Sequence, residues 1–448
     1  MFPVEAQNIR HTFIIARILL SVPTSQVQRF MLGIIIPFLL FFLIAIPVKS
    51  SHAGDYSPLN EPAAGLMSRG DYEKAVEELR KTLNLFPYDS SVRKNLAAAY
   101  SALGRQQLDR KQYDAAAENF DEARKLVADN RDYGILRGIA LYFGKRYDEA
   151  TVELEQARQS GGDNVTLFMY LGLVYYDIGN LPAAMESWDR ALELDPENKF
   201  VRDMEAKARR ESAVEAHMGK EFSSMFVISY DEGTKSDLAD AVLDTLETAY
   251  NRVGSDFSCF PAARIPVILY TRKDYRLVTA GPEWSGGLYD GKVRLPIGGA
   301  AEISPVLRAV LFHEYTHVVV GEITGDNCPT WLNEGLAEYE GRKEYSPPTP
   351  ELEKAAVSDG LLAFAGLEQS MSSLGKKDAV LAYQQSYSLV SFMISAYGLH
   401  KVRDILVNLG RGMQIDAAIS KAFADYGLTF GGIQDEWRSY LRKKYQAN

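Results

Sequence analysis

The stretch LGLVYYDIGNLPAAMESWDRALELDPEN, residues 171–198, contains two amphipathic helical segments, and its pattern occurs three more times upstream. The matching segments are GDYEKAVEELRKTL (70–83), KQYDAAAENFDEAR (111–124), KRYDEATVELEQAR (145–158) and GNLPAAMESWDRAL (179–192). Their equivalent third positions, Tyr72, Tyr113, Tyr147 and Leu181, are 41, 34 and 34 residues apart. A single helix pair cannot cover its own apolar stripe, so consecutive pairs are predicted to stack into an all-α solenoid.

A period of 34 residues with paired helices is typical of tetratricopeptide repeats, and residues 171–198 resemble that family's consensus. We expect about four repeats and a charged capping helix at residues 200–218. The longer first step is interpreted as two additional helical turns at GRQQLDR (104–110). Small residues should lie where helices cross closely: Ala75, Ala115, Ala150 and Ala184. Such arrays usually bind a protein partner on their concave side, and a spacer that only positions the next domain is the alternative.

The pattern changes near residue 222. The segments 226–231 (FVISYD) and 265–271 (IPVILYT) are rich in β-branched and aromatic residues, and residues 236–253 between them have helical periodicity. GLYDGKVRLPI (287–297) alternates and contains a turn, as a strand or short hairpin does. Helical patterns follow, so this half is predicted to be an α+β domain with a small sheet in front of helices.

The chain is therefore expected to be multidomain. The expected segments are a signal peptide or membrane anchor at 1–53, a tetratricopeptide repeat domain at 54–218 and the α+β domain at 219–448. No charged residue lies between Arg29 and Lys49, and Ser51 and Ala53 are placed as at a signal-peptide cleavage site. Whether cleaved or retained, this segment predicts an exported protein that is periplasmic, membrane-anchored or secreted. Contact with a membrane is expected only through it.

The charge balance bears on partners. The formal net charge is −10 and the pI is about 5.3, and no basic cluster interleaves with aromatic residues. A polyanion is a poor partner for such a surface, so nucleic acid is excluded as an expected partner.

The chain has two cysteines, Cys259 and Cys328, and neither belongs to a CxxC pair. A zinc site built from thiolates is therefore not expected. In an oxidising compartment an even pair can form a disulfide, and two unrelated thiols are the alternative. Because each cysteine lies in a loop beside an element of the α+β domain, we expect the two to come within bridging distance.

The stretch LFHEYTHVVV (311–320) holds two of the six histidines of the chain. It follows a helix start at Ser304-Pro305. On a helix His313 and His317 lie on nearly the same face, with Cβ atoms about 5–6 Å apart, so both rings can bind one Zn²⁺. Glu314 lies about 100° around the helix, where a general base for a zinc-activated water belongs. A buried helix whose histidines find other partners is the alternative.

A catalytic zinc needs a third protein ligand and an open position. The stretch TWLNEGLAEYEGR (330–342) offers Glu334, after a turn-rich gap that lets a second helix face the first. One zinc per chain is therefore predicted on His313, His317 and Glu334. Glu338 lies one helical turn after Glu334 and is expected to accept the free ring N–H of His313.

HEYTH followed by WLNEGLAEY resembles the gluzincin class of zinc metallopeptidases, and more narrowly the bacterial peptidase MA-like domain, over residues 222–448. The resemblance implies a zincin-like fold in which His313, His317 and Glu334 are the ligands and Glu314 the base. Glu338 matches the supporting acid, which is an aspartate in the thermolysin branch. The Gly-x-Met-Glu-Asn motif of the aminopeptidases is absent, so exopeptidase specificity is not implied.

The resemblance also implies two further parts. An edge strand at GLYDGKVRLPI (287–297) would hold an extended peptide, with a plain structural strand as the alternative. A downstream tyrosine would stabilise the oxyanion, and AYQQSYSLVSFM (382–393) offers Tyr383 and Tyr387. Tyr383 is preferred because it stands in an AYxQS pattern.

Two functions follow from these features. The first is an exported zinc endopeptidase that hydrolyses peptide bonds with a zinc-activated water and Glu314 as general base, and whose repeats recruit substrate or partner. The second is a non-catalytic or autoinhibited repeat scaffold in which the metallo-domain is structural.

Overall fold

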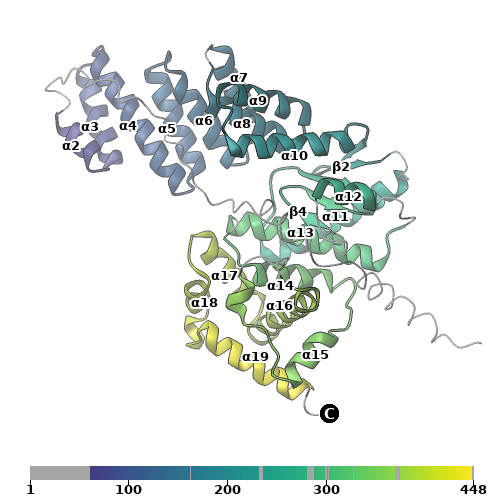
Figure 1. Cartoon of the computed structure of the whole chain (residues 1–448). Coiled ribbons are helices and arrows are strands. Elements are labelled where there is room, and N and C mark those ends of the chain that lie inside the picture. Colours follow the sequence, from purple (N-terminus) through teal and green to yellow (C-terminus); the bar gives the residue numbers. More distant parts are fainter. Residues whose placement is uncertain are drawn as a thin grey trace, which may run out of the picture. The chain divides into compact units, whose positions relative to one another are not determined.

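The structure is a computed structural model that describes residues 61–161, 163–231, 236–279, 287–297, 300, 302–325, 327–368, 371 and 374–445. The chain divides into two compact units that meet in the sequence between Ala216 and His217, and Figure 1 draws both. The predicted signal peptide or anchor, residues 1–53, lies outside the described residues. Among the helices of the described ranges, none is both long and apolar enough to span a bilayer.

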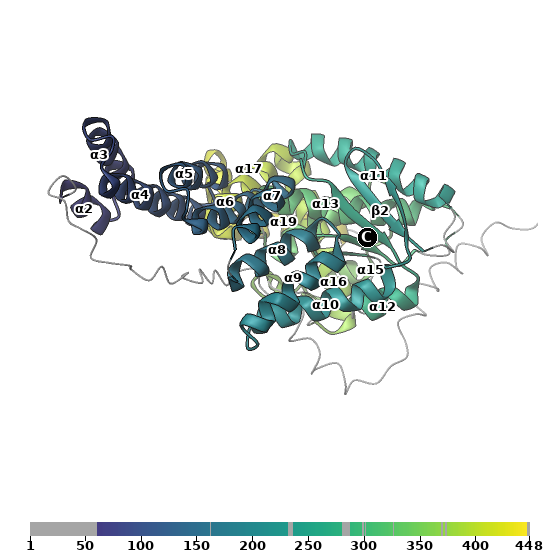
Figure 2. The same ribbon diagram turned by 90° about the horizontal axis from the view of Figure 1, so that it is seen from above.

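The first unit is an array of helix pairs. The pairs are α2 (Glu61–Ser68) with α3 (Tyr72–Leu85), α4 (Ser90–Asp109) with α5 (Tyr113–Leu126), α6 (Arg131–Phe143) with α7 (Tyr147–Gln159), and α8 (Val165–Asp177) with α9 (Leu181–Leu194). A further helix, α10 (Lys199–Glu215), packs on α9. Figures 1 and 2 show these helices stacked in chain order. The predicted all-α repeat array is confirmed.

Close helix contacts fix the register of the repeats. A Cβ atom on Gly172 would lie 2.2 Å from Nε1 of Trp188, and a Cβ atom on Gly104 would lie 2.9 Å from Cε1 of Phe120. The two glycines are two periods of 34 apart, so residues 104–110 are the ordinary end of helix α4. The interpretation of these residues as two additional turns is wrong. Helix α4 has 20 residues, whereas α8 has 13. The additional turns of α4 lie toward its N-terminal end.

The small residues at the helix crossings are largely as predicted. Ala75, Ala150 and Ala184 are completely buried. In the second pair the buried residue is Ala116, whereas Ala115 is half-buried. A shift of one position turns a side chain by about 100° around a helix, so Ala115 faces away from the crossing.

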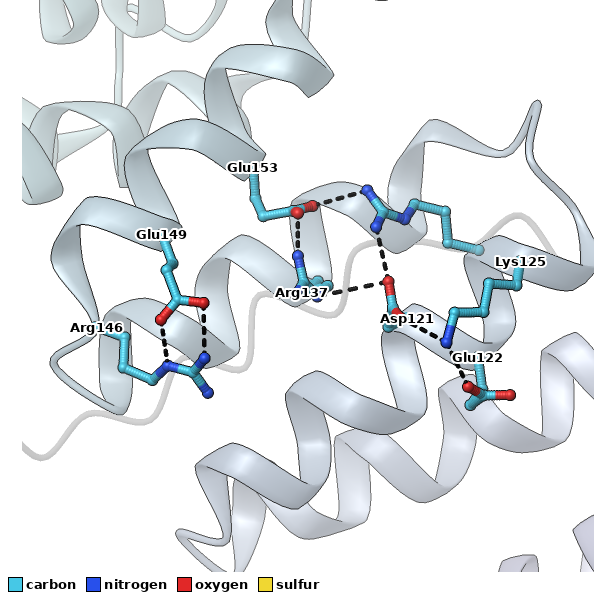
Figure 3. Close-up of polar contacts among 8 residues, drawn as sticks. Asp121, Glu122, Lys125, Arg137, Arg146, Glu149 and Glu153 are labelled. Carbon is cyan, nitrogen blue, oxygen red and sulfur yellow. Dashed lines mark hydrogen bonds and ion pairs between the residues drawn. The ribbon is translucent and has the colours of Figure 1, made fainter.

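One junction in the array is charged. Arg137 of α6 stands where α8 has the apolar Leu171, one period of 34 later. Figure 3 shows its guanidinium between Glu153 of α7 and Asp121 of α5. Arg124 of α5 donates to the same two carboxylates, at 3.0 Å to Glu153 and 2.7 Å to Asp121. Two arginines thus balance two carboxylates, which keeps the mostly buried Glu153 from being an unpaired charge.

The second unit contains a five-stranded sheet in the order β1-β2-β3-β5-β4. Its strands are β1 (Gly219–Phe222), β2 (Phe226–Tyr230), β3 (Ile265–Leu269), β4 (Leu288–Tyr289) and β5 (Val293–Leu295). β2, β3 and β5 are parallel neighbours, and the edge strands β1 and β4 pair antiparallel with β2 and β5. The segment 287–297 is therefore a hairpin with β4 at the edge, whereas β1 was not anticipated from the sequence.

Helices complete this unit. They are α11 (Ser236–Phe257), α12 (Arg272–Thr279), α13 (Pro305–Thr324), α14 (Thr330–Gly341), α15 (Pro350–Val357), α16 (Lys376–Tyr397), α17 (Leu399–Gly410), α18 (Ile415–Ala422) and α19 (Phe430–Tyr445), with short 3₁₀ turns at Phe364–Leu367 and Ala424–Tyr426. One face of the sheet contributes Val267 and Val293 to a core shared with α11 and α13. The predicted α+β architecture with a helical C-terminal half is confirmed.

Candidate metal centre

Helix α13 carries the two histidines of the centre. The Ser304 side chain accepts the Leu307 N–H at 3.2 Å, Pro305 occupies the first turn, and the helix ends at Gly325 with a left-handed φ of 55°. The helix therefore starts and stops where its sequence signals place it. His313 and His317 lie one turn apart, with ring centroids 4.8 Å from each other.

Helix α14 lies close against both α13 and α16. A Cβ atom on Gly341 would lie 2.8 Å from the carbonyl oxygen of Ala309, and one on Gly335 would lie 2.7 Å from that of Ser386. Small residues at these two positions let the helix backbones approach. Because the neighbouring Trp331 is completely buried, α14 is also fixed in rotation about its axis.

This packing brings Glu334 to the histidines. Its Oε2 lies 3.4 Å from Nε2 of His313 and 3.6 Å from Nε2 of His317. One ligand atom from each of the three residues lies within 4.8 Å of the others, the only such group in the described part of the chain. Glu334 Oε2 is buried and accepts no hydrogen bond. A buried oxygen without a hydrogen bond beside two imidazole nitrogens fits a bound cation, and two imidazoles with one carboxylate are a zinc donor set.

The electrostatics also favour a cation. Burial acts to raise the pKa of Glu334, but His317 and His313 outweigh it and hold that pKa below its usual value. Burial acts to lower the pKa of His313, but Glu334, Glu314 and Glu338 outweigh it and raise that pKa to about 9. Three carboxylates thus surround two imidazoles in a partly dry site, and a divalent cation would balance this negative charge.

The outer nitrogens of both rings face oxygen atoms. Nδ1 of His317 lies 2.9 Å from Oδ1 of Asn333, an amide oxygen that can only accept, so Nδ1 carries the proton and Nε2 is left as the ligand atom. Nδ1 of His313 lies 3.7 Å from Oε1 of Glu338, longer than a hydrogen bond. Asn333 was missed from the sequence, although its place directly before Glu334 is a usable signal.

Glu338 is held in turn by Arg342, a second residue that the sequence did not reveal. The Arg342 Nε donates to Oε2 of Glu338 at 2.8 Å, and its Nη1 donates to the carbonyl oxygen of Pro347 at 2.6 Å. The guanidinium stacks on the ring of Tyr387, with its carbon 4.3 Å from the centroid. Arg342 is mostly buried, so these contacts fix where Glu338 points.

Replacing Arg342 by methionine is expected to weaken zinc binding by about 10-fold. The change releases Glu338, which lies beside the ligand His313, and residues that support metal ligands typically affect affinity by about 10-fold or more. The matched control is Arg442→Met on the exposed side of α19, which should bind zinc like the wild type. Competition with a chelator of known affinity measures both. An unchanged zinc affinity in Arg342→Met would contradict the supporting role given to Glu338.

Glu314 is 5% exposed and lies next to His313 on the same helix. Burial raises its pKa and the nearby Glu334 adds to that effect, while His313 and His317 oppose it. A carboxylate with a raised pKa is a stronger base. The backbone of Gly287, directly before β4, lies against this carboxylate, since a Cβ atom there would come within 2.4 Å of Oε1.

The two candidate tyrosines of α16 have different neighbours. Burial raises the pKa of Tyr383 far above its usual value, and the charges of Glu334, Glu314 and Glu338 raise it further. Its phenol is therefore protonated and lies within the field of the centre. Tyr387 instead stacks on Arg342. This arrangement favours Tyr383 as the hydrogen-bond donor, although its role stays a prediction.

The cysteines are not joined by a disulfide. Burial raises the pKa of Cys328, and the charge of Glu334 adds to that effect. The Cys328 thiol therefore stays protonated and is a poor competitor of the histidines for a metal. Of the two alternatives left open by the sequence, the structure has two separate thiols.

Comparison with family models assigns both units. Residues 264–443 match the Peptidase MA superfamily, and residues 101–163 and 165–198 match tetratricopeptide repeat models. The chain thus carries tetratricopeptide repeats followed in the sequence by a Peptidase MA superfamily domain. No curated protein matches the chain.

Several solved structures of repeat proteins are similar to part of the chain. The tetratricopeptide domain of Arabidopsis OM64 is 22% identical over 27% of this chain and 98% of its own, with a TM-score of 0.26. A tetratricopeptide repeat protein of Thermus thermophilus, TTC0263, is 23% identical over 35% of this chain and 84% of its own, with a TM-score of 0.26. MamA AMB-1 is 19% identical over 35% of this chain and 81% of its own, with a TM-score of 0.28.

Proposed function

We propose that the Peptidase MA superfamily domain of this chain is a zinc-dependent endopeptidase, and that the repeats recruit its substrate or a protein partner. The observation that carries the proposal is the buried Glu334 Oε2, which accepts no hydrogen bond and faces Nε2 of both His313 and His317. Structural zinc sites usually have four protein ligands, whereas three ligands beside a buried carboxylate suit hydrolysis. Glu314 supplies that carboxylate.

The residues have distinct tasks in this mechanism. His313, His317 and Glu334 hold the zinc, which when bound would acidify a water molecule and polarise the scissile carbonyl. Glu314 accepts a proton from the water and gives it to the leaving amine. Tyr383 donates a hydrogen bond to the oxygen of the former carbonyl as negative charge develops there. Asn333 orients the His317 imidazole through its hydrogen bond, and Glu338 places a negative charge 3.7 Å from Nδ1 of His313.

An extended polypeptide is the proposed substrate. In the described sheet β4 is an edge strand that pairs with β5, and it contacts helix α13, which carries the centre. An edge strand offers main-chain groups to a peptide in β conformation, independent of its side chains. Together with the missing aminopeptidase motif, this supports cleavage within a chain. We also propose export, on the basis of the uncharged run between Arg29 and Lys49.

The proposal is tested on the purified chain from residue 54 onward by measuring its metal content and its cleavage of unfolded casein. One zinc per chain and cleavage that stops with a chelator and returns with zinc are expected. A zinc-loaded, folded chain that leaves casein and a random peptide library intact would overturn the peptidase and favour the repeat scaffold.

Tyr383→Phe is expected to lower kcat by about 10²-fold, because it removes one hydrogen-bond donor to the developing oxyanion. Tyr387→Phe is the matched control four residues later on the same helix. Its ring can still stack on Arg342, so kcat should change less than about 3-fold. If Tyr387→Phe proves the more damaging change in steady-state kinetics, the assignment of the two tyrosines is reversed.

A further inference from the structure

Gly287 meets the carboxylate end of Glu314 with its main chain. A Cβ atom built on Gly287 would lie 2.4 Å from Oε1, 2.6 Å from Cδ and 2.7 Å from Cγ of Glu314. All three distances are below the 3.0 Å that real Cβ atoms keep from other heavy atoms. Any other residue at this position would therefore have to displace the Glu314 side chain or shift the backbone before β4.

Steric contact is what the structure records at this glycine: the three atoms nearest to an added Cβ all belong to Glu314. Gly291, in the turn between β4 and β5, is the opposite case: its φ is 94° and a Cβ atom there would meet nothing within 4 Å. Gly291 serves the turn, whereas Gly287 leaves space.

A side chain at position 287 should cost little stability. The three nearest atoms that it would meet all belong to the Glu314 side chain, and none of them to the backbone. Glu314 directly follows the ligand residue His313 on α13, so displacement of its carboxylate would change the position of the base relative to the ligands. Folding and metal binding can therefore survive a change that misplaces the base.

We propose that Gly287 is a positioning residue for Glu314: its bare main chain sets the place of the carboxylate beside the metal ligands. This inference rests on the proposed function, in which Glu314 transfers protons and the position of its carboxylate therefore affects the rate. A misplacement of about 1 Å can lower a rate by about 10²-fold when the reacting groups must be aligned. Gly287 thus shapes the site from a segment distant in sequence, at the entry to the edge strand.

The test compares Gly287→Ala with Gly366→Ala, a glycine of the same unit with ordinary φ and open space around it. Gly287→Ala should lower kcat by about 10- to 100-fold, keep one zinc per chain and change KM less than about 3-fold. Gly366→Ala should cleave like the wild type. The decisive variant is the double change with Glu314→Ala, which removes the Cγ, Cδ and Oε1 atoms that an added Cβ atom would meet. In that background the alanine at position 287 should cost less than about 2-fold, because no part of the carboxylate remains for it to displace.

A second readout does not depend on turnover. Acetohydroxamic acid chelates zinc through two oxygens and shares its hydroxyl proton with a nearby carboxylate, so its dissociation constant reports where Glu314 lies. Gly287→Ala should weaken this binding at least 5-fold, by about 1 kcal/mol, and Gly366→Ala should not.

The outcomes separate the two proposals. If the wild type binds zinc and acetohydroxamic acid but cuts nothing, the peptidase is overturned, while the binding constants still decide the role of Gly287. Three outcomes would each overturn the inference: equal losses from Gly287→Ala with and without Glu314→Ala, unchanged hydroxamate binding in Gly287→Ala, or loss of zinc or of folding in Gly287→Ala. A wild-type chain that binds no zinc overturns both.

Discussion

Glu314→Gln is expected to lower the rate of casein cleavage by about 10²–10⁴-fold while one zinc per chain stays bound. Glutamine keeps the volume of the side chain and the helix, and the three ligand residues are untouched. What it removes is the carboxylate that accepts the proton from water and returns it to the leaving amine. The rate loss should therefore appear in kcat, and the metal content measured by elemental analysis should not change.

The matched control is Glu322→Gln, the same chemical change at an exposed position of the same helix. This variant should cleave casein like the wild type. If Glu314→Gln loses its zinc, the assignment of Glu314 as a base that is not a metal ligand is wrong. If it cleaves casein at the wild-type rate, the proton-transfer mechanism fails.

His317→Ala is expected to remove the zinc. The change deletes one of three protein ligands and leaves Asn333 without its imidazole partner. Changes in residues that only orient ligands cost about 10–100-fold in affinity, so loss of a ligand should exceed about 100-fold. Purified variant protein should contain less than a tenth of an equivalent of zinc, and cleavage should be lost with it.

Thermal unfolding gives an independent check on His317→Ala. Because zinc binds the folded chain, adding zinc should raise the Tm of the wild type and not that of the variant. His400→Ala, at an exposed histidine of α17, is the control and should behave like the wild type. A full equivalent of zinc in His317→Ala would place the metal elsewhere.

The features that could be predicted are those that depend on residues close together in the sequence or on a regular period. The 34-residue period defined the helix pairs, and the spacing of His313 and His317 placed both rings on one face. The register of the longer helix α4 was misjudged because seven additional residues turn a helix almost twice, so the apolar pattern looks the same on either side of the insertion. The Gly104–Phe120 contact, which spans two helices, resolved it.

The features that were missed depend on contacts between segments far apart in the chain. Asn333 is close in sequence to Glu334, but its bond to His317 exists only after α14 packs on α13. Gly287 gives no periodic signal, and its meaning comes from Glu314, 27 residues later. The insertion of β5 between β3 and β4 likewise follows from pairing, not from local propensity.

The centre has a further consequence for the order in which the domain matures. All three ligands lie between residues 313 and 334 on consecutive helices, so their contacts close short loops and can form early in folding. Tyr383 joins from α16, well downstream, and Gly287 joins through the edge of a sheet whose pairings are non-local. A chain still emerging from the ribosome can thus bring its three ligands together before Tyr383 has been synthesised. In the proposed peptidase, binding of the metal would then precede completion of the oxyanion site.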